Sequence, residues 1–129
     1  PYTTLFRSPL DVRLDNDDYT MVQPDLLIVC DESDGDKRRV NGAPDFVAEI
    51  LSSSNRDHDM LLKLYKYRNA GVRESWIVDP EKKKAAVYDF ENGELPVSYT
   101  FGDMVPLRIS EGKCSVDFSV INKAVSRFD

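Results

Sequence analysis

Two acidic residues lie in or beside segments that otherwise have the composition of buried strands. Asp25 comes directly before the apolar run 26–30 (LLIVC), and Glu49 lies inside the apolar segment 45–51 (DFVAEIL). A buried carboxylate is costly unless it is paired, hydrogen-bonded or bound to a metal. If the two segments are neighbouring strands, both side chains could bind one Mg²⁺, which takes oxygen ligands from one or two carboxylates and keeps several waters. The alternative, which composition alone favours, is that Asp25 begins its strand in water and Glu49 pairs with a nearby Lys or Arg.

The segment that follows Glu49 supplies a cation. Lys63 lies in a predicted amphipathic helix that ends at about Ala70. Its ammonium could stabilise charge that develops on a phosphate, or orient an attacking water. The commoner arrangement for a helical lysine is a surface ion pair, here with Asp59 four residues earlier. Tyr67, one turn after Lys63, is compatible with both arrangements and is a secondary candidate.

Asp45 is a second acidic residue on the strand predicted to carry Glu49. The two are four residues apart, and the rise of a strand separates them by about 13 Å. They cannot easily share one ion, so Asp45 is a secondary candidate that could lie at the rim, bind a second metal or cap a turn. His58 is the only histidine, so neither a His-based zinc site nor a Ser-His-Asp triad is supported.

The predicted elements that must position these residues are strands and two helices. Strands are predicted at 10–14, 26–30, 45–51 and 73–78, and 1–6 is expected to be an edge strand or an ordered arm. A helix is predicted between the loop 52–55 and residue 70, followed by a hairpin of 85–90 and 95–101. Short strands at 104–109 and 113–116 and a final helix at 118–128 complete the prediction. Asn92-Gly93 is the strongest hairpin signal in the chain. This order predicts a mixed α/β domain built around one sheet.

Several finer expectations accompany this outline. The segment 31–40 is expected to be an exposed loop, and Ser54 with Asp57 fits a capping box at the start of the first helix. Tyr65 and Trp76 are expected in the core. In the last helix, we expect Asp117 to cap the N-terminus and Val120, Ile121, Ala124 and Val125 to point inward. Cys30 and Cys114 are expected to be reduced core thiols of a cytoplasmic protein, with a disulfide as the minor alternative.

Length and charge limit the classes of protein. A chain of 129 residues supports one hydrophobic core, and its longest apolar run is too short to cross a bilayer. The net charge of −6 argues against a protein that coats duplex DNA by electrostatics alone. Residues 54–84 are nevertheless basic, with 8 Lys and Arg against 5 Asp and Glu. This block suits a phosphate-facing surface, and a solvated helix face would give the same count.

A series of short motifs in a fixed order resembles a known family. The motifs are QPDL at 23–26, GAPD at 42–45, EILS at 49–52, then Arg56, Asp59, Lys63-Leu64 and Tyr67, and finally GVRESWIVDP at 71–80. In these residues the chain resembles the Uma-type family of restriction-endonuclease-like proteins, which belongs to the PD-(D/E)XK nuclease superfamily. The resemblance covers roughly residues 9–90 well and the C-terminal hairpin more loosely.

The resemblance implies a restriction-endonuclease-like core, a mixed sheet flanked by helices, with a C-terminal β-hairpin extension. It implies hydrolysis of DNA phosphodiester bonds with Mg²⁺ or Mn²⁺, and a homodimer, because superfamily members often pair to cut two strands. The short apolar runs, for their part, predict no association with a membrane. Carried over by position, Asp25 is the metal-binding aspartate and Glu49 is the acidic member of the (D/E)XK element. Two residues after Glu49, however, stands Leu51 where the superfamily has lysine. The resembling family supplies that lysine from the following helix, where Lys63 stands.

The family also usually carries an N-terminal helical segment with a further acidic residue. We therefore expect a single restriction-endonuclease-like domain over residues 1–129 that lacks this segment. The favoured hypothesis is a Mg²⁺-dependent endonuclease in which Asp25 and Glu49 hold the metal and Lys63 assists. Two alternatives stay open: a catalytically inactive nuclease-fold module used in binding or assembly, and a metal-dependent phosphohydrolase that acts on nucleotides.

Overall fold

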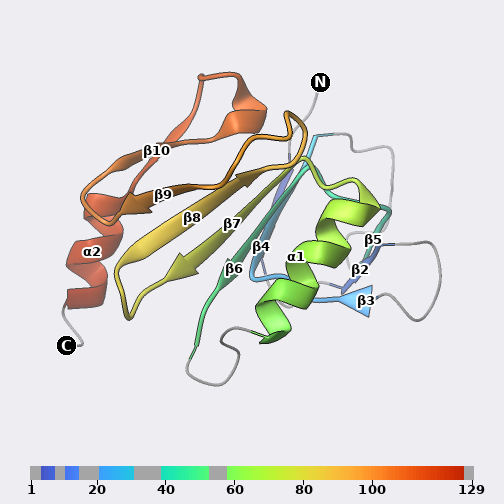
Figure 1. Ribbon diagram of the computed structural model, residues 1–129, viewed down its shortest axis with the longest axis horizontal. Coiled ribbons are helices and arrows are strands. Elements are labelled where there is room, and N and C mark those ends of the chain that lie inside the picture. The colour runs from blue at the N-terminus through green and yellow to red at the C-terminus, as the bar shows by residue number, and fades with distance from the viewer. Residues whose placement is uncertain (1–3, 8–10, 15–20, 31–38, 53–57, 127–129) are drawn as a thin grey trace.

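The structure is a computed structural model that describes residues 4–7, 11–14, 21–30, 39–52 and 58–126. Its centre is a six-stranded mixed sheet in the order β1-β4-β6-β7-β8-β9 (Figure 1). These strands are β1 (Thr4–Arg7), β4 (Leu26–Val29), β6 (Phe46–Ile50), β7 (Glu74–Asp79), β8 (Lys84–Asp89) and β9 (Val97–Thr100). Neighbouring strands are antiparallel except β6 and β7, which are parallel and are joined through a helix. A parallel pair needs such a crossover, which is why the first helix lies against the sheet.

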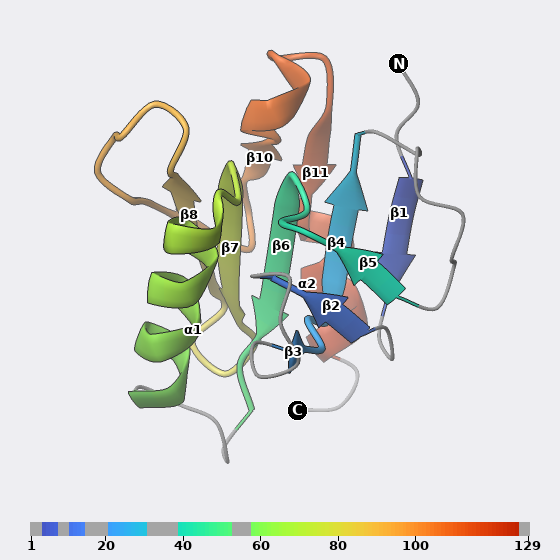
Figure 2. The ribbon, with the colours of Figure 1, turned by 90° about the vertical axis from the view of Figure 1, so that its right-hand side faces the viewer.

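Other elements cover both faces of this sheet. Figure 2 shows the helix α1 (His58–Ala70) and a small sheet on the viewer's side, and the helix α2 (Phe118–Ser126) behind. The small sheet has the order β3-β2-β5 and consists of β2 (Asp11–Arg13), β3 (Met21–Val22) and β5 (Arg39–Asn41). On the α2 side, β10 (Met104–Pro106) and β11 (Ser115–Asp117) form a hairpin around the 3₁₀ helix η1 (Arg108–Ser110).

Each face of the central sheet has its own core because side chains alternate along the strands. On β6, Phe46 and Ala48 join the core under α2, whereas Val47 joins the core under α1. Trp76, Phe101 and Phe118 contribute aromatic rings to the α2 core, and Trp76 packs edge-on against Phe46. The prediction of Trp76 as a core residue is therefore confirmed.

The residues of α1 that are buried against the sheet are not all those expected from the sequence. Met60, Leu64 and Tyr67 are buried, whereas Tyr65 is 64% exposed. The prediction of Tyr65 as a core aromatic is therefore wrong. The buried residues follow the i, i+4, i+7 spacing of one helical stripe, and Tyr65 lies about 100° around the helix from Leu64. The helix ends before Gly71, whose φ of 100° is the left-handed conformation expected of a glycine that terminates a helix.

Other sequence expectations have mixed outcomes. The hairpin formed by β8 and β9 is confirmed, and Asp117 accepts a hydrogen bond from the Ser119 N–H at 3.0 Å, as a helix cap should. The predicted loop 31–40 is wrong at its end, because Arg39–Asn41 pairs with β2; residues 31–38 lie outside the described ones.

The capping box at 54–57 also lies outside the described residues. Val120 is 63% exposed and does not point inward as predicted, because the buried stripe of α2 passes through Phe118 and Ile121 instead.

The two cysteines are free thiols, and Cys114 is exposed rather than part of the core, because it lies directly before β11, whose first residue Ser115 is also exposed. Among the helices described by the structure, none is long and apolar enough to cross a membrane.

Candidate active site

The ladder between β4 and β6 brings Asp25 and Glu49 to the same place. Leu26 pairs with Ala48, so the next position along this antiparallel ladder sets Asp25 opposite Glu49. Residues that are opposite in such a pair point to the same face of the sheet, here the α1 face. A hydrogen bond of 2.7 Å from the Ile50 N–H to Oδ2 of Asp25 fixes the aspartate at this point. The sequence-based condition that the two strands be neighbours is confirmed.

Two side chains of α1 contact the carboxylate of Glu49, one at each oxygen. Tyr67 donates a hydrogen bond of 2.5 Å from its hydroxyl to Oε1, and Nζ of Lys63 lies 3.6 Å from Oε2. Lys63 and Tyr67 are one helical turn apart, which places both on the same side of α1. Glu49 itself is 4% exposed. The crossover helix therefore covers the carboxylate and supplies its partners.

Burial dominates the electrostatics of this group. Burial raises the pKa of the Glu49 carboxyl, the hydrogen bond from Tyr67 and the charge of Lys63 oppose that rise, and the nearby charge of Asp25 adds to it. The pKa of Tyr67 is also raised, first by burial and then by the charge of Glu49, with a further contribution from Asp25. The phenol is therefore neutral at physiological pH and acts as a hydrogen-bond donor. Asp25 influences both groups, as expected of a charge within the same site.

Lys63 connects the buried carboxylate to the surface. Its side chain is 34% exposed, whereas that of Glu49 is 5% exposed. One ammonium can therefore contact Glu49 and still meet a group that arrives from solvent. The partner of Lys63 in this ion pair is Glu49, which was predicted to bind the metal.

Asp45 lies at the opposite end of β6 and is not brought together with Glu49. Its Oδ2 accepts a 2.7 Å hydrogen bond from the Cys30 N–H, and its Oδ1 lies 3.2 Å from Nη1 of Arg73. Arg73 also binds Glu91, at 2.9 Å. These contacts join the start of β6 to the chain before β7.

The donor set at the Glu49 end suits a hard cation. Asp25 and Glu49 offer only oxygen ligands, and Mg²⁺ binds through one or two carboxylates with water completing its shell. A cation would also offset the charge of Asp25, which adds to the effect of burial in raising the Glu49 pKa. Within the described ranges, no group of three or more His, Cys, Asp or Glu side chains could hold a metal. The site therefore fits a water-rich magnesium ion and does not fit a fully protein-coordinated metal such as structural zinc.

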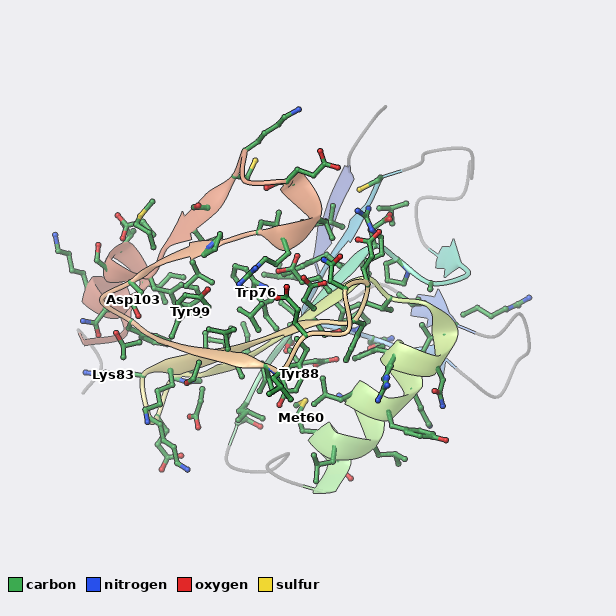
Figure 3. The ribbon with its side chains drawn as sticks, turned by 45° about the horizontal axis from the view of Figure 1, so that its top comes forward. Met60, Trp76, Lys83, Tyr88, Tyr99 and Asp103 are labelled. Atoms are coloured by element: carbon green, nitrogen blue, oxygen red, sulfur yellow. The ribbon has the colours of Figure 1, made fainter. Side chains whose placement is uncertain are left out.

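A groove beside α1 is a separate feature. It is an open hollow of about 480 Å³ between α1 and the turn of the β8–β9 hairpin. Its lining is mostly apolar and includes Tyr65, Arg68, Tyr88 and Phe90. Figure 3 labels Tyr88 on β8 and Met60 on α1. Asp25, Glu49 and Lys63 do not line this groove, so the candidate catalytic residues lie apart from it.

Comparison with known proteins gives the family. The Uma2 family, described as "Putative restriction endonuclease", matches residues 3–115. The chain belongs to the Uma2 family. No curated protein matches it.

A solved structure agrees with this assignment at the level of the fold. It is described as "a putative nuclease belonging to DUF820 from Anabaena variabilis", and the two superimpose with a TM-score of 0.77 at 15% sequence identity. The match covers 95% of this chain and 69% of the other. The predicted restriction-endonuclease-like fold, a mixed sheet flanked by helices with a C-terminal hairpin extension, is confirmed.

In this Uma2 chain, two features of the site were not evident from sequence. The Ile50 N–H was not predicted to bind Asp25, because a backbone donor leaves no signal in residue types. Tyr67 was only a secondary candidate, yet it makes the shortest described contact with Glu49. Its spacing of four residues from Lys63 was the available signal, since it places both residues on one helical face.

Proposed function

We propose that this Uma2 protein is a Mg²⁺-dependent endonuclease that hydrolyses DNA phosphodiester bonds at the Asp25–Glu49 end of the sheet. The observation that carries the proposal is the approach of Lys63 to within 3.6 Å of Glu49. Leu51 stands where the superfamily has lysine. In this proposal Lys63 of α1 takes the place of that lysine next to Glu49. Membership of the Uma2 family supports the reaction class.

Each residue has a distinct role in this proposal. Asp25 and Glu49 hold Mg²⁺, with Mn²⁺ as a substitute, and the bound ion would polarise the phosphate and activate water. Lys63 places a positive charge at the boundary between the buried carboxylate and solvent, where it steadies charge on the phosphate or orients the water. Tyr67 holds Glu49 in place. Asp45 supports the site from a distance by fixing the start of β6.

The surface of α1 provides a reason for an acidic protein to approach DNA. The helix carries Lys63, Lys66 and Arg68 and a single acidic residue, Asp59. A local excess of basic side chains attracts phosphate even when the net charge is negative, because fields are strongest near the charges that produce them. Since one site cuts one strand, we propose that a homodimer cuts both strands of a duplex.

A second candidate function is a binding or assembly module without catalysis. It is favoured by the contacts that already satisfy both carboxylates: Ile50 N–H binds Asp25, and Tyr67 and Lys63 bind Glu49. A site that is satisfied by its own side chains has less need of a cation.

Cleavage of supercoiled plasmid separates the two candidates. We would compare the wild type with Glu49→Gln, Asp25→Asn and Lys63→Met, in Mg²⁺, in Mn²⁺ and in excess chelator. Lys113→Met is the matched control, because Lys113 is an exposed lysine between η1 and β11 and is not part of α1. We expect nicking only with metal, a loss of about 100-fold or more in the three site variants, and less than about a threefold change in the control.

Two outcomes would count against the nuclease. Cleavage by Glu49→Gln at the wild-type rate would exclude this site as the catalytic one. Absence of both cleavage and Mn²⁺ binding in the wild type would favour the non-catalytic module. Hydrolysis of mononucleotides without plasmid cleavage would instead indicate a nucleotide phosphohydrolase.

A further inference from the structure

The two oxygens of the Glu49 carboxylate are held in unequal ways. Oε1 receives the 2.5 Å hydrogen bond from Tyr67, whose side chain is 1% exposed. Oε2 faces the ammonium of Lys63 at the looser distance of 3.6 Å. One oxygen is therefore bound to a rigid buried donor, and the other is bound to a flexible, partly exposed cation.

We propose that Tyr67 sets the cation preference of this site by keeping Oε1 engaged, so that Glu49 presents Oε2 alone and the site favours Mg²⁺ and Mn²⁺ over Ca²⁺. The inference rests on the function proposed above, because it requires a divalent cation at Asp25 and Glu49. Tyr67 acts through Glu49 and is a positioning residue.

The physical reason lies in what the two cations require. Mg²⁺ demands six close ligands in near-ideal octahedral geometry and keeps most of its waters, which suits a carboxylate that offers one oxygen. Ca²⁺ is larger, takes six to eight oxygens and readily accepts both oxygens of one carboxylate. A glutamate with one oxygen tied to a buried phenol cannot turn to offer both without breaking that hydrogen bond.

Tyr67 is better suited than Lys63 to impose this restriction. The phenol is rigid, it is packed in the core between α1 and the sheet, and it has few rotatable bonds. Lys63 has a long flexible stem and a 34% exposed side chain, so it can move aside when a cation arrives. Removal of the Tyr67 hydroxyl alone would free Oε1 while it leaves the aromatic ring in place.

Binding calorimetry on the intact chain tests the inference without any assay of cleavage. Mg²⁺, Mn²⁺ and Ca²⁺ would each be titrated into the wild type, Tyr67→Phe and Tyr65→Phe. Tyr65 is the matched control because it is a 64% exposed tyrosine of the same helix. We expect Tyr67→Phe to shift the ratio of the Ca²⁺ and Mg²⁺ dissociation constants towards Ca²⁺ by about tenfold, and Tyr65→Phe to leave the ratio within about twofold.

A general loss of packing would weaken both cations together, so the ratio isolates positioning from stability. Thermal melting of each variant by circular dichroism shows whether it is folded. If Tyr67→Phe does not fold, the wild type still decides the matter, since binding of Ca²⁺ as tight as that of Mg²⁺ would overturn the inference.

The role of Tyr67 and the proposed nuclease function would be overturned by different results. An unchanged ratio in folded Tyr67→Phe, with Mg²⁺ binding in the wild type that is lost in Glu49→Ala, overturns the role of Tyr67 alone. No binding of any of the three cations by the wild type overturns both this inference and the proposed nuclease.

Discussion

Asp25 lies opposite Glu49 where the β4–β6 ladder ends, and the ladder rather than a loop fixes their relative position. A shift of register by one residue would send every side chain of a strand to the other face. The apolar residues around the pair prevent such a shift, because Leu27 and Val47 belong to the core under α1. The same packing that stabilises the sheet therefore sets the geometry of the two carboxylates.

The hydrogen bond at Asp25 separates its structural role from its charge. Asp25→Asn keeps an oxygen that can accept from the Ile50 N–H, whereas Asp25→Ala removes it. We expect the free energy of unfolding of Asp25→Asn, measured by urea denaturation, to lie within about 0.5 kcal/mol of the wild-type value. That of Asp25→Ala should be lower than that of Asp25→Asn by about 1 kcal/mol. Both should weaken Mg²⁺ binding, by at least the roughly 10- to 100-fold seen for outer-shell partners of metals. Unchanged Mg²⁺ affinity in both variants would remove Asp25 from the site.

Lys63 should matter for stability as well as for activity. Lys63→Met leaves the buried Glu49 carboxylate without its cation, and the Glu49 pKa should rise further because only Tyr67 then opposes burial. We expect a loss of about 1 kcal/mol at pH 7, a modest value because Lys63 is partly exposed and solvent screens the pair. Lys66→Met should change the free energy of unfolding by less than about 0.5 kcal/mol. Equal stability of the two variants would show that the ion pair contributes nothing measurable.

Sequence patterns were sufficient for the strands that carry the site, because local rules decide strands and turns. Side chains alternate along the predicted strand 45–51, and accordingly Val47 lies in the core under α1 whereas Phe46 and Ala48 lie in the core under α2. Asn92-Gly93 likewise indicated the β8–β9 hairpin. The resemblance then gave the family and the expected residues.

Interactions between segments that are distant in the sequence were harder to predict. The preference of Lys63 for Glu49 depends on how α1 packs across the sheet, and no spacing within the helix encodes that choice. Tyr65 and Tyr67 are the same residue type two positions apart, yet one is exposed and one is buried. Only the orientation of the helix distinguishes them. The contact of Asp45 with Arg73 is equally non-local, and it gives Asp45 a partner at the end of β6 away from Glu49.

Asp45 should therefore behave as a structural residue. Asp45→Ala removes the acceptor of the Cys30 N–H and the partner of Arg73, and we expect it to lower the free energy of unfolding by about 1 to 2 kcal/mol. A double-mutant cycle with Arg73→Met should give a coupling energy of about 0.5 to 1 kcal/mol. Calorimetric Mg²⁺ affinity should stay within about twofold of the wild type. A tenfold loss of affinity in a folded Asp45→Ala protein would instead make Asp45 a participant in the site.

A second buried carboxylate, on the α2 side of the sheet, should make stability depend on pH. Glu74 is 0% exposed and accepts hydrogen bonds from Trp76 Nε1 at 2.6 Å and from the Ile109 N–H at 2.9 Å. It thereby ties η1 to β7. Burial raises the pKa of Glu74 above the ordinary value of 4.5, although these hydrogen bonds oppose the rise and Asp89 adds to it.

The sign of the dependence follows from proton uptake. A raised pKa means that the folded state holds the Glu74 proton more tightly than the unfolded state. The associated stability is fully present below about pH 4.5 and is lost as the pH rises through the folded pKa, with a slope of at most about 1.4 kcal/mol per pH unit. Glu74→Gln cannot titrate and lacks this slope.

We expect the free energy of unfolding of the wild type, measured in urea from pH 4 to pH 7.5, to fall relative to that of Glu74→Gln as the pH increases. Glu111→Gln, a substitution of an exposed glutamate in the turn after η1, should follow the wild type at every pH. Parallel curves for the wild type and Glu74→Gln would show that the hydrogen bonds from Trp76 and Ile109 fully offset the effect of burial.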